Sequence, residues 1–367
     1  MSNVDPAYRT VDRDDFAAMI VNERYFERSP AFEEIIARTE EHFWNPADPD
    51  YINLVNPEPL EGSILPEDFV MESRTAVWDR LDEKQRLDFL HDSARWSLSQ
   101  LLHGEQGALN LSSSLCDIFL DPGAQEYAAN QVREEARHVH AFTLYMQARF
   151  NGEISPVGDT LGGLLKEVVA SKLVYQKIVG MQMLVEGLAM GAFMTFHTRA
   201  NDPLLRRLCQ LIMTDEAFHH KFGKIWAHET VPDLPQAEHE AVEDWAEECF
   251  QKLLFNLINA EQRREIYPKY GLDWEWVRGA INEAVTDEDR REAMMDNSDI
   301  FRTLIKTLDN AGIITDRTRS TYENWVDMSA LRAEGDALVG YAVAEEGIED
   351  LKAINAKKRK IVRKISA

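Results

Sequence analysis

The sequence predicts an all-α protein built on a four-helix bundle, with additional helices at both ends. Of its 367 residues 44% are hydrophobic, and it has only 18 glycines and 13 prolines, which is typical of a globular, largely helical chain. One pattern of glutamates and histidines occurs twice, 81 residues apart. A lone Glu followed by Glu-x-x-His, given twice on paired helices, is the ligand set of a carboxylate-bridged dinuclear metal site in such a bundle.

The two copies of the pattern have the same internal spacing. Their residues are Glu105, Glu135 and His138 in the first copy and Glu186, Glu216 and His219 in the second. In each copy the lone glutamate lies sixteen residues before an Asp-Pro turn, and the next glutamate lies fourteen residues after it. With a rise of about 1.5 Å per residue, the two carboxylates therefore lie at nearly the same height on antiparallel helices.

End signals delimit the first pair of helices. Asp82 followed by Gln85 resembles a capping box, and a helix is expected from there to about Ser113. Asp121-Pro122 begins the next helix, with Asp as the N-cap and Pro in the first turn. That helix is expected to end near Asn151-Gly152, a typical C-terminal signal.

The second pair repeats the first. A long apolar helix is expected to end near Ala200, and after the Asp202-Pro203 turn another helix should run to about Glu229. Between the pairs, residues 152–175 supply a crossover and an extra helix, which we expect to be broken near Gly162-Gly163.

Three parts are expected along the chain, packed together as one structural domain. Residues 1–81 read as an irregular, proline-containing elaboration with short helices, for example around 29–43. Residues 82–232 form the bundle, and residues 233–367 add several helices rich in Trp and acidic residues. The basic run at 357–360 is interpreted as a solvated tail.

Charge and cysteine content exclude several classes of protein. The net charge of −24 disfavours nucleic acid as the main partner. The three cysteines are scattered and form no Cys-x-x-Cys, so neither an iron–sulfur cluster nor a disulfide framework is expected. The polar N-terminus does not resemble a signal peptide, and we expect a cytoplasmic protein.

The segment from Ile178 to Phe196 is nineteen mostly apolar residues long, which meets the length criterion for a membrane span. Glu186 lies near its centre, and a carboxylate there is costly in lipid and in a dry core alike unless a cation neutralises it. We therefore interpret the segment as a buried bundle helix whose one charge binds a metal, and expect no membrane association.

The donor set indicates which metals fit. Four carboxylates and two imidazoles are hard to borderline donors that suit two Fe ions, with Mn possible at one or both positions. Glu134 and Asp215 directly precede the paired glutamates. They are candidates to accept the free ring N–H of the opposing histidine, although each could also be an ordinary solvated acid.

The residues Glu105, Glu135-Ala-Arg-His138, Glu186 and Glu216-Ala-Phe-His219 resemble the ferritin-like di-iron carboxylate superfamily. The chain length is similar to that of its larger oxygen-activating branch: ribonucleotide reductase small subunits, bacterial monooxygenase hydroxylases and acyl-carrier-protein desaturases. The resemblance covers about residues 82–230. It implies an all-helical homodimer that activates O2 with two ferrous ions and oxidises an organic substrate or a protein side chain.

The chain departs from each well-marked subfamily. Phe142 stands where reductase small subunits usually carry their radical tyrosine, Met190 where the monooxygenase hydroxylases have a threonine, and Ile212 where the arylamine N-oxygenases have an extra histidine. The resemblance is therefore specific for the metal site and much weaker for the branch.

Large apolar residues one turn from the ligands suggest a dry substrate pocket, with Ala189 and Gly191 leaving space. The predicted lining is Leu109, Phe142, Met183, Gly187, Met190, Phe193 and Met213. A pocket that excludes water protects a reactive oxidant from side reactions. Ordinary core packing explains the same residues equally well.

The function expected from these observations is that of a di-iron oxygenase that hydroxylates, N-oxygenates or desaturates a small or medium-sized organic substrate with O2. An external electron donor, such as a ferredoxin or a reductase, is expected because the sequence has no dinucleotide-binding Gly-x-Gly-x-x-Gly and no cysteine cluster. The alternatives are a radical-generating reductase-like subunit, against which Phe142 argues, and a ferroxidase or iron-storage protein. Storage proteins need only about half this length. A manganese catalase is a weaker option.

Overall fold

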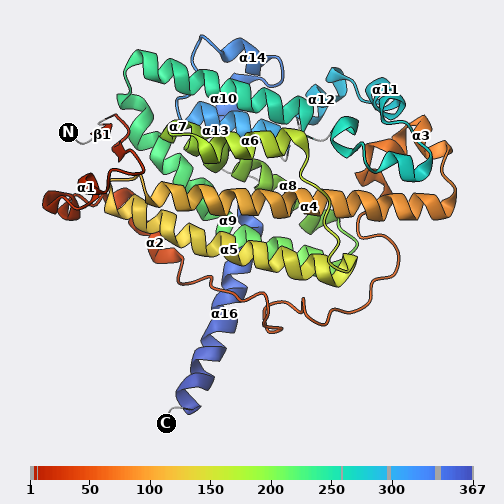
Figure 1. Cartoon of the computed structure of the whole chain (residues 1–367), viewed down its shortest axis with the longest axis horizontal. Coiled ribbons are helices and arrows are strands. Elements are labelled where there is room, and N and C mark those ends of the chain that lie inside the picture. The colour runs from red at the N-terminus through yellow and green to blue at the C-terminus, as the bar shows by residue number, and fades with distance from the viewer. Residues whose placement is uncertain (1–3, 6, 258, 296–298, 335–339, 366–367) are drawn as a thin grey trace.

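The computed structural model describes residues 4–5, 7–257, 259–295, 299–334 and 340–365. Within these residues the fold is all-α, as the sequence predicted, apart from one antiparallel pair of short strands, β1 (Val4–Asp5) and β2 (Thr10–Val11). Long helices dominate the body of the molecule, and the two termini lie at its edges (Figure 1).

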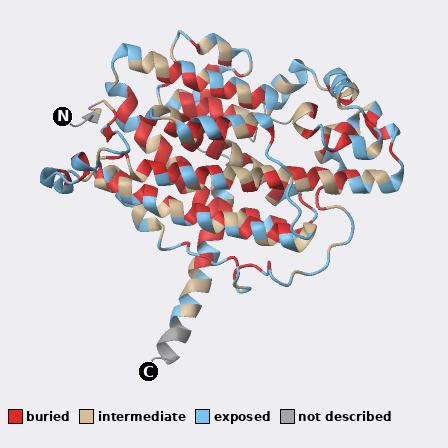
Figure 2. Ribbon diagram, in the orientation of Figure 1, coloured by how far each residue is buried: buried red, intermediate tan, exposed pale blue. Residues whose placement is uncertain are grey.

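Four long helical segments carry the predicted ligands. They are α4 (Glu83–Cys116), α5 (Pro122–Phe150), the π-helix η5 (Ile178–Val185) continued by α8 (Glu186–Arg199), and α9 (Pro203–Thr230). α4 packs along α5, and α8 packs along α9. Buried residues run along the inner faces of these helices (Figure 2).

The predicted helix ends match the structure closely. The Asp82 side chain accepts from the backbone N–H of Gln85, and the Gln85 side chain returns the bond, so the capping box is present. α4 ends at Cys116, three residues later than expected. Asp121 caps α5, and Asn151 ends that helix in the left-handed conformation with φ of 53°.

Asp202 ties the beginning of α9 to the end of α5. Its carboxylate is fully buried and caps α9 by accepting from the N–H of Leu204 at 3.0 Å. The same carboxylate accepts from the Tyr145 hydroxyl and from Arg149 Nε, both at 2.7 Å. Because α5 and α9 each supply a Glu-x-x-His pair, this junction fixes the height of one pair against the other.

Replacing Asp202 by alanine is expected to lower the free energy of unfolding by about 3 kcal/mol. The change removes a helix cap and leaves the nearly buried Arg149 without its ion-pair partner. Asp202→Asn keeps an acceptor oxygen for the cap, and its amide NH2 can donate to the Tyr145 oxygen, so it should cost clearly less. Urea unfolding measures both, and equal losses in the two variants would contradict the contribution of the cap.

The helix between the two pairs differs from the expectation. α6 (Asp159–Ala170) runs without a break through Gly162-Gly163. Its buried face of Leu161, Leu164, Leu165 and Val168 outweighs the roughly 1 kcal/mol that each glycine costs in a helix.

The helix that reaches Glu186 is not a regular α-helix throughout. After α7 (Val174–Lys177) the chain forms the π-helix η5, and the N–H of Glu186 donates to the carbonyl of Met181, five residues back. All eight residues of η5 are buried. The apolar segment Val174–Arg199 is 72% buried over its most hydrophobic stretch, which favours a core helix over a membrane span.

Shorter elements from both ends of the chain surround the bundle. The N-terminal ones are α1 (Phe16–Met19), η1 (Asn22–Phe26), η2 (Pro30–Phe32), α2 (Glu33–Arg38), η3 (Glu67–Phe69), η4 (Met71–Arg74) and α3 (Ala76–Asp79). The C-terminal ones are η6 (Val231–Asp233), α10 (Gln236–Asn256), η7 (Ala260–Arg263), η8 (Tyr267–Tyr270), α11 (Trp274–Ala284), α12 (Asp287–Ala293), α13 (Ile300–Asn310), α14 (Arg319–Glu323), α15 (Met328–Ala333) and α16 (Tyr341–Ile365).

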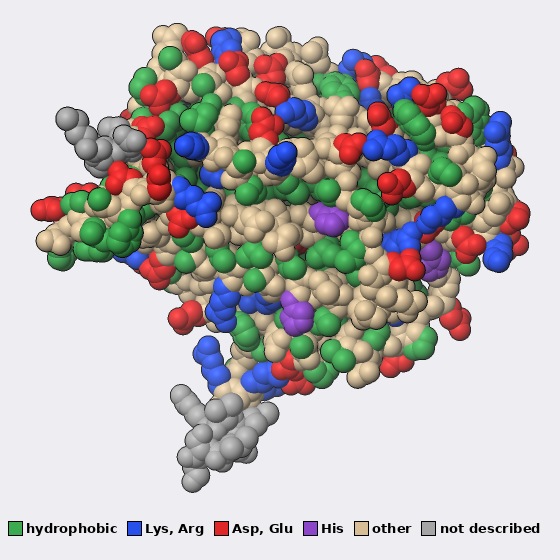
Figure 3. Space-filling model, in the orientation of Figure 1, with side chains coloured by type: hydrophobic (Ala, Val, Ile, Leu, Met, Phe, Trp, Pro, Cys, Tyr) green, Lys and Arg blue, Asp and Glu red, His purple; other side chains and the backbone are tan. Residues whose placement is uncertain are grey.

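Three of these elements project from the body. α16 packs on α9 with its first turns and then extends away toward the bottom of the view, while α1 and η1 form a small protrusion at the left edge (Figure 1). Hydrophobic side chains gather on that protrusion (Figure 3), where Phe16 and Phe26 are 69% and 90% exposed.

Candidate metal centre

The structure brings all six predicted ligands to one level in the bundle. α4 supplies Glu105, α5 supplies Glu135 and His138, the first residue of α8 is Glu186, and α9 supplies Glu216 and His219. Each of the six is at most 6% exposed. Their donor atoms form two overlapping groups, and within each group all donor atoms lie within 4.8 Å of one another.

Two of the glutamates belong to both groups. The first group is Glu105, Glu135, His138 and Glu216, and the second is Glu135, Glu186, Glu216 and His219. Glu135 and Glu216 could therefore serve in both groups if metal ions were bound, whereas each lone glutamate and each histidine belongs to one group. This division follows from the helix geometry, since the Glu-x-x-His residues lie on one face of each helix.

Both histidines turn Nδ1 toward the centre. His138 Nδ1 lies 3.1 Å from an oxygen of Glu105 and 3.1 Å from an oxygen of Glu216. His219 Nδ1 lies 3.0 Å from an oxygen of Glu135. These are the nitrogens that would bind the ions.

The other ring nitrogen of each histidine meets a buried carboxylate from the opposing helix. His138 Nε2 lies 2.8 Å from Asp215 Oδ2, and His219 Nε2 lies 2.9 Å from Glu134 Oε2. These are the two contacts that the sequence led us to expect. A carboxylate that accepts the Nε2 proton leaves the Nδ1 lone pair free for a metal and holds the ring in place.

The electrostatics of the cluster are those of a cation site. Burial raises the pKa values of Glu105 and Glu186 well above the usual range. For Glu216 burial acts in the same direction, but the charge of His219 together with hydrogen bonds from Glu186, His138 and His219 outweighs it and lowers the pKa. Glu135 Oε2, both oxygens of Glu216 and His219 Nδ1 have no hydrogen-bond partner among the described residues. Burying a carboxylate oxygen without a partner costs free energy of folding. Bound divalent cations would remove that cost.

Two buried glutamines complete the polar core, and the sequence patterns had not pointed to them. Gln131 Nε2 lies 3.2 Å from an oxygen of Glu135, 3.2 Å from an oxygen of Glu186 and 3.1 Å from Gln182 Oε1. Gln131 could have been found, because it precedes Glu135 by four residues and shares its helix face. Gln182 could not have been found in this way, because the π-helix changes the spacing at which residues face inward.

The segment that follows α2 also reaches the centre, which nothing in its sequence indicated. Trp44 is fully buried and donates from Nε1 to Asp215 Oδ2 at 3.0 Å. Arg137 donates to the same oxygen at 2.7 Å. His42, also fully buried, forms a third potential metal-binding group with Glu134 and Asp215.

An apolar cavity of about 300 Å³ lies beside the metal centre and is bounded by Glu105 and Glu186. Most of its wall is hydrophobic, and its other lining residues are Phe69, Trp96, Ser97, Gln100, Leu101, Gly104, Ala108, Gly158, Leu161, Met181, Val185, Leu188, Ala189, Gly191, Ala192, Thr195, Phe196, Leu257, Ile300 and Phe301. The predicted pocket residues Leu109, Phe142, Met183, Gly187, Met190, Phe193 and Met213 do not line it. Ala189 and Gly191, which were expected to leave space for a substrate, do line the cavity.

The predicted lining does not coincide with this cavity, and for Met183 the π-helix gives a reason. In η5 the fifth residue before Glu186, Met181, lines the cavity, whereas Met183, three residues before Glu186, does not. Phe142 and Phe193 are fully buried and stack at 6.1 Å between ring centroids. Both rings belong to a hydrophobic core cluster of the bundle.

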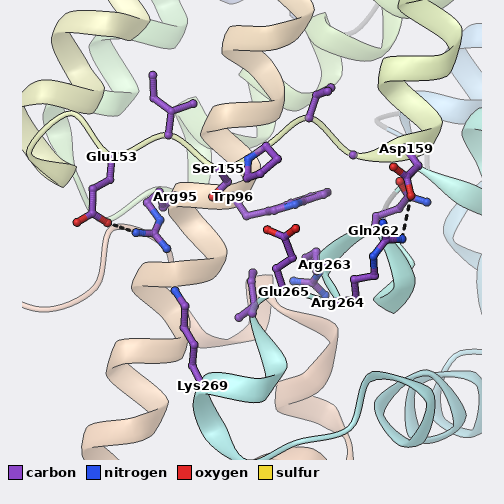
Figure 4. A pocket seen from close by; sticks show the side chains of 15 residues that line it. Arg95, Trp96, Glu153, Ser155, Asp159, Gln262, Arg263, Arg264, Glu265 and Lys269 are labelled. Carbon is purple, nitrogen blue, oxygen red and sulfur yellow. Dashed lines mark hydrogen bonds and ion pairs between the residues drawn. The ribbon is translucent and has the colours of Figure 1, made fainter.

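A second, polar hollow of about 390 Å³ adjoins the cavity, because Trp96 and Gly158 line both. Figure 4 shows its charged side chains, four of which form two ion pairs. Arg264 pairs with Asp159 at 2.8 Å, and Arg95 pairs with Glu153. The apolar cavity thus borders a polar surface hollow near the loop that precedes α6.

Neither a comparison with protein-family models nor one with curated protein sequences finds a match for this chain. The buried cluster of glutamates and histidines can hold metal ions. Its geometry, together with the adjoining cavity, therefore carries the functional argument.

Proposed function

We propose that the protein is a non-haem di-iron oxygenase that uses O2 to oxidise a small or medium-sized organic molecule. One observation carries the proposal: Glu105 and Glu186 are members of the metal-binding groups and also form part of the wall of the apolar cavity. A molecule in the cavity would lie directly against the metal centre. Such contact serves oxidation of a substrate and has no use in iron storage.

The residues divide into bridging and terminal ligands. Glu135 and Glu216 would bridge the two ions, Glu105 and His138 would complete one position, and Glu186 and His219 the other. Four carboxylates and two imidazoles suit Fe, and Mn at one or both positions. When bound, the two ions would supply the O2-activating redox chemistry.

The chain itself would position the carboxylate ligands and exclude water from the site. Gln131 donates toward Glu186 and Glu135, so it holds the two carboxylates that face each other across the bundle. The hydrophobic wall keeps water from the reacting atoms, which prevents side reactions and strengthens electrostatic interactions inside the site. Among the described residues that line the cavity, Glu105 and Glu186 are the only charged ones, and this favours an uncharged, apolar reacting group.

The remaining parts of the proposal come from the sequence. Phe142 lies in the core where a reductase-like subunit would carry a tyrosine, which favours oxidation of a bound molecule over storage of a radical. Electrons would come from an external protein donor. We further expect a cytoplasmic homodimer.

The proposal is tested by exposing the reduced, iron-loaded protein to isotopically labelled O2 with a panel of uncharged aromatic and aliphatic compounds. The expected result is a product that has gained one labelled atom or lost two hydrogens. Growth of an iron mineral without any organic product would favour storage instead. A lasting tyrosyl signal in electron paramagnetic resonance would favour a radical-generating subunit.

Filling the cavity at Gly104 is expected to abolish binding of apolar molecules without removing the metals. Gly104 lies in α4 beside Glu105, lines the cavity, and a Cβ there would meet no atom of the described residues within 4 Å. Gly104→Leu should therefore project into the cavity without forcing the helices apart. We expect at least a tenfold weaker affinity for naphthalene, measured by its fluorescence, at unchanged iron content.

Gly163→Leu is the matched control. Gly163 is an exposed glycine of α6 that does not line the cavity, and its Cβ position is equally empty. The control gains the same helix propensity and should bind naphthalene as the unmodified protein does. Equal affinities in the two variants would show that the cavity is not the binding site.

A further inference from the structure

His42 lies between the two carboxylates that orient the histidine ligands. Its Nε2 is 3.3 Å from Asp215 Oδ1 and 3.6 Å from Glu134 Oε1. The ring is fully buried and lies parallel to the ring of Phe218, with 5.0 Å between the centroids and 1° between the planes. One nitrogen therefore faces two acidic residues that come from different halves of the repeated pattern.

Each of these carboxylates uses its other oxygen for a metal-binding histidine. Asp215 Oδ2 faces His138 and Glu134 Oε2 faces His219. A carboxylate held at both oxygens cannot rotate about its last bond without losing a contact. Among the ion pairs of the described residues, those of His42 reach the second oxygen of both carboxylates. Arg137 lies 3.9 Å from Glu134 Oε1 but meets Asp215 at Oδ2.

The charges at this place favour an imidazole donor over a third metal ion. Arg137 already contributes a buried positive charge and a 2.7 Å contact with Asp215. Burial alone would lower the pKa of His42, but its contacts with Asp215 and Glu134 outweigh that effect and raise it to about 9. A cationic ring between two anions offsets the charge of both carboxylates without a further ion.

We propose that His42 is a positioning residue that holds both histidine ligands at once, through Asp215 for His138 and through Glu134 for His219. Carboxylates that hold metal-binding histidines are typically worth about 10- to 100-fold in metal affinity. A residue that restrains both carboxylates should therefore influence both metal positions. His42 comes from the segment after α2, outside the bundle, so the docking of that segment and the binding of metal are linked.

The test is a titration of the metal-free protein with Co²⁺, followed by calorimetry and by the visible absorption of the bound ion. His42→Ala should weaken binding at both positions by about tenfold or more. Asp215→Asn should weaken chiefly the His138 position, and Glu134→Gln chiefly the His219 position. His42→Gln, whose amide can donate to both carboxylates, should recover much of the affinity. Two unchanged affinities, or the loss of only one, in His42→Ala would overturn the proposal.

Two further readouts separate this inference from the proposed function on whose metal site it rests. A purely structural role of His42 would lower the unfolding temperature of the metal-free protein and leave Co²⁺ affinity and absorption unchanged, which would overturn the inference. If His42→Ala does not fold, the comparison of His42→Gln with the unmodified protein decides, with unchanged Co²⁺ absorption as the contrary result. Binding of fewer than two Co²⁺ ions by the unmodified protein would contradict the di-iron centre itself.

Discussion

Loading with iron is expected to raise the midpoint of thermal unfolding by roughly 10 °C or more. Without metal, four glutamates share a buried site in which several carboxylate oxygens have no hydrogen-bond donor among the described residues. An ion that binds the folded chain and not the unfolded one adds about 4 kcal/mol at a thousandfold excess over its dissociation constant. Each kcal/mol corresponds to about 2–4 °C in domains somewhat smaller than this one. Scanning calorimetry of metal-free and loaded protein, with the iron content measured, provides the test.

Glu186→Gln is an informative control for this prediction, because it should have opposite effects on the stability of the metal-free and the iron-loaded protein. Burial raises the pKa of Glu186, so a neutral amide should leave the metal-free protein as stable as before or more stable. The same change removes a ligand and should reduce the stabilisation by iron. Identical melting temperatures of the loaded and metal-free forms of the unmodified protein would show that the cluster does not bind metal in the folded state.

Replacement of a bridging glutamate is expected to remove both ions, whereas replacement of a terminal one should remove chiefly one. Glu216 belongs to both metal-binding groups, while Glu105 belongs to one. Glu216→Ala should therefore lower the iron content from two ions per chain to nearly none, and Glu105→Ala to about one. Elemental analysis after iron loading and desalting measures both.

Glu126→Ala serves as the control for the loss of a carboxylate from α5 away from the site. Glu126 is exposed and pairs with Arg28 at the surface, so its removal should leave two ions bound. Two ions retained by Glu216→Ala would refute the bridging assignment, even if the other variants behaved as expected.

Much of the bundle could be predicted because its information is local and periodic. The Asp-Pro dipeptides specify where α5 and α9 begin, and counting along the helices from these turns places Glu105 level with Glu135. Glu134 and Asp215 obey the same 81-residue offset as the ligands. Residues related in this way occupy equivalent places on equivalent helices, so their contacts follow from helix geometry.

The residues that were missed reach the site in ways that no local pattern records. Trp44 meets Asp215 across 171 positions of sequence, from an irregular segment without periodicity. The cavity lining depends on the π-helix η5. No residue type marks a π-helical turn in a sequence as clearly as proline marks the end of an α-helix. Gly162-Gly163 failed as a helix breaker because the packing of Leu161 and Leu164 decided the conformation of α6.

The π-helix η5 also affects which single-residue insertions and deletions this chain can tolerate during evolution. A π-helical turn is in effect an α-helix with one residue inserted, and such turns are frequent at functional sites. A single-residue deletion between Ile178 and Val185 would restore a regular α-helix and leave Glu186 in register with its Asp-Pro turn. The same deletion between Glu216 and His219 would rotate the histidine by about 100° around α9. Single-residue insertions and deletions ahead of Glu186 should therefore be tolerated and would reshape the cavity. Within the Glu-x-x-His pairs they would destroy the arrangement of the ligands.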